Sequence, residues 1–192
     1  MKKFNLLTLV AALLLSVSAS AQIQKGNVLV GGDLANLNLG LDNSKRVSFD
    51  IMPKAAWFVQ DNLALGGYVR FGIDGAKNSA TTTRYGIGAL GRYYAGPEME
   101  VVKHGRFFGE VNVGVGGVNV SDGGGKTNGL DLGFGPGFAY FITPNVGLET
   151  LLKYQGVIGF GSATTQNALN LSFGFQIYLP GQATANRIKS GR

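Results

Sequence analysis

The sequence predicts an all-β protein: an eight-stranded antiparallel up-and-down transmembrane β-barrel that follows a cleaved signal peptide. Residues alternate between an apolar side and a small or polar side over long stretches, as at 63–74, which marks extended strands. Aromatic pairs stand beside the turns, and 31 of the 192 residues are glycine. Strands of about ten residues with one apolar side and aromatic ends are typical of a barrel that crosses lipid.

A loosely repeated hairpin supports this prediction. Residues 136–149 and 53–66 both begin with proline, continue with alternating residues and an aromatic pair, and reach a short polar turn that ends in Asn145 or Asn62. Each copy therefore predicts two antiparallel strands with aromatic residues beside their turn.

The two ends of the chain differ from its body. Residues 1–21 have a basic start, an apolar run at 6–15 and an Ala-Ser-Ala sequence before Gln22, as in a secretory signal peptide. The run is shorter than the roughly 20 residues of a spanning helix. We expect the barrel at 22–179 and a basic C-terminal tail at 180–192.

Composition excludes several classes of function. Five of the 17 basic residues lie in the two ends, which leaves 12 basic against 11 acidic residues in the body. A nucleic-acid-binding domain would concentrate positive charge on its folded part. The chain has no cysteine, so disulfides, thiolate metal sites and lipoprotein anchors are excluded.

Eight strands account for the body of the chain. The first changes phase along its length, which predicts a bulge near Ala35. Polar connections alternate with connections flanked by aromatic pairs, and an even strand count places both termini on the periplasmic side. The polar connections, at 42–45, 75–83, 121–127 and 161–167, are then the outer loops. The expected strands are 27–41, 46–59, 63–73, 84–94, 107–120, 130–142, 146–157 and 169–179.

The inward sides of these strands carry a balanced set of charges. Five acidic and five basic residues project inward, Asp33 being the one whose phase is affected by the predicted bulge. The interior of an eight-stranded barrel is just wide enough for side chains to fill it, which predicts a lumen closed by salt bridges. Independently solvated charges would instead require an open water column. Besides Asp33, the charged residues predicted to project inward are Asp50, Lys54, Arg70, Arg84, Arg92, Glu110, Asp131, Glu149 and Lys153.

Aromatic residues beside the turns indicate which side faces lipid. Such residues gather at membrane interfaces, and charges are absent from the apolar sides over long spans. A soluble lipocalin-like barrel is the alternative fold, with apolar residues lining a ligand cavity and charges outside. The residues expected in the aromatic girdle are Trp57, Tyr93, Phe107 and Tyr140.

These hairpins, the signal peptide and the final strand at 170–178 resemble the small eight-stranded outer-membrane barrels of the OmpX and OmpA-barrel type, often labelled porin-family. The resemblance covers 22–179. It implies a monomer in the outer membrane of a Gram-negative bacterium, with membrane lipid and the barrel assembly machinery as partners and a structural or surface-interaction role. The chain departs from the family in its short outer loops and in the tail after Leu179, where family members commonly end.

Motifs for catalysis and cofactors are weak. The sequence 86–91 matches the Gly-x-Gly-x-x-Gly dinucleotide fingerprint, but alternation continues where a helix should begin. The stretch 123–127 resembles the end of a phosphate-binding loop and also lacks a following helix. His104 is the only histidine and lies in a connection predicted on the periplasmic side. We therefore expect no enzymatic activity, cofactor or metal, with a narrow passive porin as the alternative function and a lipid-modifying barrel enzyme or a lipocalin-like binder less favoured.

Overall fold

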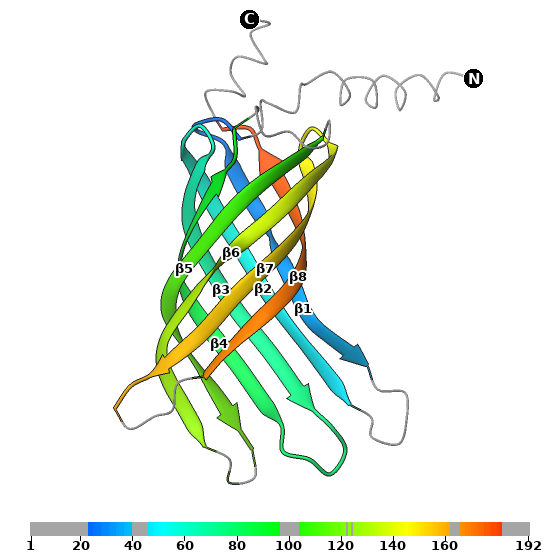
Figure 1. Ribbon diagram of the computed structural model, residues 1–192, viewed down its shortest axis with the longest axis vertical. Helices are drawn as coiled ribbons and strands as arrows, with labels where there is room; N and C mark the ends of the chain where they lie inside the picture. The colour runs from blue at the N-terminus through cyan, green and yellow to red at the C-terminus, as the bar shows by residue number, and fades with distance from the viewer. Residues whose placement is uncertain are drawn as a thin grey trace, which may run out of the picture.

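The computed structural model describes residues 23–39, 46–96, 104–121, 123, 125–161 and 166–181. Each of its eight strands pairs in antiparallel fashion with the next, and β1 also pairs with β8, which closes a barrel (Figure 1). The predicted fold class is confirmed. No helix among the described residues is long and apolar enough to cross a membrane. The strands are β1 (Val28–Leu39), β2 (Val47–Gln60), β3 (Leu63–Gly75), β4 (Thr82–Tyr94), β5 (Gly105–Val120), β6 (Lys126–Thr143), β7 (Val146–Gly159) and β8 (Gln166–Leu179).

Several strands extend beyond their predicted ends into sequence that was expected to form loops. The β5–β6 ladder continues to the pair Asn119 and Lys126, so Lys126 and Thr127 belong to β6 and not to the connection 121–127. Ladder hydrogen bonds join backbone groups and do not need apolar side chains, so polar strand ends continue the pairing. The hydrophobic pattern therefore predicts the central part of each strand better than its ends.

The predicted bulge in β1 is confirmed. The register with β2 shifts between Ala35 and Asn38, and Asn36 has a φ of 53°. Asparagine tolerates this left-handed conformation better than most residues. Beyond the bulge the pairing with β2 resumes at Asn38 and Ser48.

The two sides of the sheet have opposite character. Large apolar side chains such as Val111, Ile87 and Phe173 are exposed on the outside, whereas Glu110 and Asp131 are buried. This polarity is the reverse of a lipocalin-like barrel, so that alternative is wrong. The exterior is the apolar belt that a lipid-spanning barrel needs.

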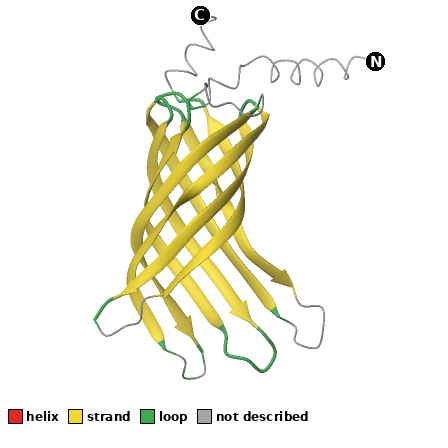
Figure 2. Ribbon diagram, in the orientation of Figure 1, coloured by secondary structure: helices red, strands yellow, loops and turns green. Residues whose placement is uncertain are grey.

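The two ends of the barrel differ in their connections. The tight turns at 61–62 and 144–145 lie at the end where β1 begins and β8 ends, here called the turn end. The connections that follow β1, β3, β5 and β7 lie at the opposite end, here called the loop end (Figure 1, Figure 2). At the turn end, the backbone N–H of Gly181 donates to the side-chain oxygen of Asn27 at 3.1 Å, which ties the two ends of the barrel chain together. The predicted signal peptide and most of the predicted tail lie outside the described residues.

Candidate functional site

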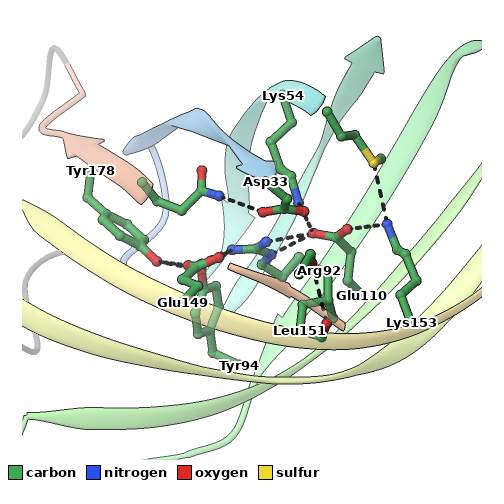
Figure 3. Close-up of polar contacts among 12 residues, drawn as sticks. Asp33, Lys54, Arg92, Tyr94, Glu110, Glu149, Leu151, Lys153 and Tyr178 are labelled. Carbon is green, nitrogen blue, oxygen red and sulfur yellow. Dashed lines mark hydrogen bonds and ion pairs between the residues drawn. The ribbon is translucent and has the colours of Figure 1, made fainter. Parts of the chain in front are cut away.

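The lumen holds a central charge cluster near mid-barrel, contributed by five strands (Figure 3). Period-two alternation brings these side chains inward from β1, β2, β4, β5 and β7. All six are buried, and they comprise three acids and three bases. The central charge cluster consists of Asp33, Lys54, Arg92, Glu110, Glu149 and Lys153.

Arg92 is the hub of this cluster. Its Nη1 donates to both carboxylate oxygens of Glu149, at 2.8 and 2.7 Å. Its Nε and Nη2 both donate to Oε2 of Glu110, at 3.0 and 2.6 Å. The fixed fork of a guanidinium allows one side chain to hold two carboxylates in this way. Arg92 is only 1% exposed, so these contacts are shielded from solvent.

Two lysines complete the cluster. Lys153 and Lys54 donate to opposite oxygens of Glu110, at 2.6 and 2.8 Å, and Lys54 also donates to Asp33 at 2.5 Å. Glu110 therefore contacts three cations. Because the cluster balances three positive against three negative groups, no net charge is buried without a partner.

The remaining predicted lumen charges form two pairs nearer the loop end. Arg84 donates from Nε and Nη2 to the two oxygens of Asp50, at 2.9 and 3.0 Å. The pair of Arg70 and Asp131 is looser, with 3.4 Å between Nη1 and Oδ1. The structure thus divides the ten inward charges into one cluster and two pairs, and the buried salt bridges of the cluster fill the lumen at its level.

A layer of aromatic side chains lies between the central charge cluster and the turn end. Neighbouring rings have centroids 5.1 to 6.4 Å apart. The Tyr178 hydroxyl lies 2.7 Å from that of Tyr94 and donates to Glu149 at 2.8 Å, which joins the layer to the cluster. This aromatic layer consists of Phe58, Tyr94, Phe108, Phe141 and Tyr178, all buried.

Sequence reasoning missed the aromatic layer, although its signal was present. In each aromatic pair, such as Trp57 and Phe58, the predicted outer girdle includes the first ring and not the second. Alternation requires the second ring to face inward. Aromatic pairs beside the turns therefore indicate two bands of aromatic side chains, one on the exterior of the barrel and one in its lumen.

The first members of these pairs lie on the exterior near the turn end. Trp57 and Tyr93 are the most exposed, at 58% and 59%. Phe107 packs against Phe138 with ring centroids 5.1 Å apart. Tyr140 lies edge-on to the His104 ring at 6.4 Å, and His104 immediately precedes β5 at this same end.

The other half of the lumen contains a cavity of about 570 Å³, here called the vestibule. Arg46 and Asp74 line it at the loop end, and Asp33 and Lys153 of the central charge cluster line it at mid-barrel. The vestibule is therefore a pocket that ends at the cluster. Its further lining residues include Asn36, Ser48, Asp50, Arg70, Arg84, Gln155, Asn167, Asn170 and Ser172.

The glycine-rich motif at 86–91 lies within β4 and is followed by more strand. A Cβ on Gly88 would lie 2.2 Å from the backbone oxygen of Val113, and one on Gly86 would lie 2.7 Å from Oδ2 of Asp131. Close packing of strand and lumen therefore explains these glycines without a nucleotide. Within the described ranges, no group of three or more histidine, cysteine, aspartate or glutamate residues could hold a metal ion.

Comparison with known proteins gives matches among solved structures alone: no family model matches the chain, and no curated protein matches it. The crystal structure of Neisserial surface protein A, NspA, is 19% identical, with a TM-score of 0.54 over 79% of this chain and 95% of that one. The outer membrane protein OprG from Pseudomonas aeruginosa is 11% identical, with a TM-score of 0.52 over 86% and 100%. This chain has the fold of the small outer-membrane barrels. The resemblance to OmpX-like and OmpA-like barrels is confirmed at the level of the fold.

Proposed function

We propose that this protein is a non-enzymatic integral barrel of the Gram-negative outer membrane, with a structural or surface-interaction role and no conducting pore. The observation that carries this proposal is the filled lumen, in which the aromatic layer and the central charge cluster follow one another along the axis. The similarity to OprG, an outer membrane protein, and the exposed apolar belt support the location.

The same two layers weigh against a narrow passive porin. A hydrated ion needs a continuous polar path, and the buried rings of the aromatic layer provide none at their level. The vestibule is the roomy part of the lumen, and it ends at Asp33 and Lys153. A pore would need both layers to move aside together.

The proposed partners are outer-membrane lipid and, during biogenesis, the barrel assembly machinery. Lipid would contact the apolar belt, of which Leu169, Leu171 and Phe173 on β8 are examples. We propose a monomer, since the closed barrel leaves no unpaired strand edge of the kind that templates association. Non-enzymatic function is supported by the position of His104 at the turn end, away from the vestibule.

Planar-bilayer recording tests the proposal. We expect no stable conductance steps from the purified barrel. The variant Arg92→Ala with Phe108→Ala removes one large side chain from each layer and should raise conductance, which shows that the assay detects an opened lumen. The matched variant Val111→Ala with Trp57→Ala removes outward side chains and should stay silent. Steady ohmic conductance of the unaltered protein would overturn the closed-lumen proposal and favour the narrow porin.

A further inference from the structure

The vestibule is built like a binding site for a small polar molecule. Its volume of about 570 Å³ lies within the roughly 300–1,000 Å³ of ordinary ligand pockets. Side-chain amides and hydroxyls line it alongside the charges, at Asn36, Gln155, Asn170 and Ser48. Groups of this kind exchange hydrogen bonds with hydroxyl-bearing ligands.

The acidic residues of the vestibule are already neutralised by close cations. Asp50 has the bidentate contact from Arg84. Asp74 accepts from Arg46 at 2.9 Å, and Asp33 accepts from Lys54. These carboxylates therefore present little uncompensated negative charge to an incoming anion.

Arg70 differs from the other vestibule cations. It is 8% exposed, and no acceptor among the described residues lies within hydrogen-bond distance of its Nε. Its ion-pair partner Asp131 accepts from the Tyr68 hydroxyl at 2.8 Å and from Gln155 at 3.3 Å, and is 3.4 Å from Arg70. Because neutral donors satisfy Asp131 and the Arg70–Asp131 contact is loose, the positive charge of Arg70, which lines the vestibule, can serve an anionic ligand there.

We propose that the vestibule binds a small hydroxyl-bearing carboxylate from the external medium, with Arg70 as the carboxylate-binding residue. A carboxylate oxygen would accept from a terminal N–H of the Arg70 guanidinium, whose contact with Asp131 is 3.4 Å long. The surrounding amides and hydroxyls would contact the ligand's hydroxyl groups. A sugar acid is the simplest molecule that combines these features. The proposal is independent of whether the barrel conducts, since it concerns the open half of the lumen.

The test titrates the full-length folded barrel in detergent micelles with glucuronate, and with glucose as the uncharged analogue. Nuclear magnetic resonance follows the side-chain Nε–H signal of Arg70, and calorimetry gives the affinity. We expect saturable binding of glucuronate with a shift of that signal, and much weaker binding of glucose. Arg70→Met should weaken glucuronate binding by about tenfold or more. Lys77→Gln, which removes one exposed positive charge outside the vestibule, should change it by less than about twofold.

A second variant keeps the test decisive if Arg70→Met fails to fold, as judged by heat-modifiable gel migration. Asp131→Asn removes the negative charge beside Arg70 while an amide oxygen can still accept from Tyr68, so glucuronate should bind several-fold more tightly. Absence of saturable glucuronate binding to the unaltered barrel would refute the proposal. So would equal losses from Arg70→Met and Lys77→Gln, or equal affinity for glucose.

Discussion

The guanidinium carbon of Arg92 lies 4.1 Å from the centroid of the Phe108 ring. One side chain therefore belongs to both filled layers, since the same guanidinium holds Glu149 and Glu110 through hydrogen bonds. A cation over an aromatic face gains about 2 kcal/mol when both groups are desolvated. This contact couples the charge balance of the lumen to the packing of its aromatic layer.

Replacing Arg92 should therefore be costly. Arg92→Met leaves Glu149 and Glu110 with fewer cations in a buried setting, which is expected to lower the free energy of unfolding by about 3–5 kcal/mol. Urea unfolding in lipid vesicles measures this loss. Arg84→Met, in the partly exposed pair with Asp50, should cost about 1 kcal/mol or less. Equal losses from the two variants would show that the central charge cluster is solvated.

The cluster also predicts non-additivity. Arg92→Met combined with Glu149→Gln removes the cation and one of its acids together, so the double variant should be more stable than the sum of the two single losses implies. Additive losses would mean that the two side chains do not interact, in contradiction to their 2.7 Å contact.

The sequence allowed the strand number, the bulge and the inward charges to be predicted because all three depend on period-two alternation. Strand ends such as Lys126 could not be predicted from hydrophobicity, since a polar residue pairs its backbone as well as an apolar one. Alternation predicts which side chains face inward, but it does not predict which of them contact one another. That Lys54 contacts Glu110, 56 positions away, depends on the register around the closed barrel.

Apolar positions on β8 provide a test of which side faces lipid. Leu171 is 52% exposed on the exterior, so Leu171→Arg near mid-membrane should lower the free energy of unfolding by about 2–4 kcal/mol. Ser172 is 6% exposed and lines the vestibule. Ser172→Arg therefore avoids the cost of placing a charge in lipid, and the new side chain has cavity space beside it. Refolding titrations compare the two. A larger loss at Ser172 than at Leu171 would reverse the assignment of inside and outside.

Trp57 is the only tryptophan and reports on the predicted aromatic girdle. Because amphipathic rings locate at the membrane interface, its fluorescence should be quenched more by lipids brominated near the headgroup than by lipids brominated near the chain end. The variant Trp57→Phe with Leu171→Trp moves the fluorophore to mid-barrel and should reverse this order. Stronger deep quenching of Trp57 itself would contradict the girdle.

The orientation of the barrel decides which medium the vestibule meets. The chain has no cysteine, so single substitutions give unambiguous labelling sites. Lys77→Cys lies in the exposed connection between β3 and β4, and Asn145→Cys lies in the exposed turn between β6 and β7 at the opposite end. The barrel begins with β1 and ends with β8 at the turn end, and outer-membrane barrels place short turns in the periplasm.

A membrane-impermeant maleimide should therefore label Lys77→Cys on intact cells and Asn145→Cys only after permeabilisation, with the cysteine-free parent unlabelled in both conditions. The polar connection at 75–83 then faces the exterior, and so does the vestibule mouth, where Arg46 pairs with Asp74. The reverse pattern would place the vestibule in contact with the periplasm. Its ligand would then have to come from the periplasm, and the aromatic layer would close the barrel on its external side.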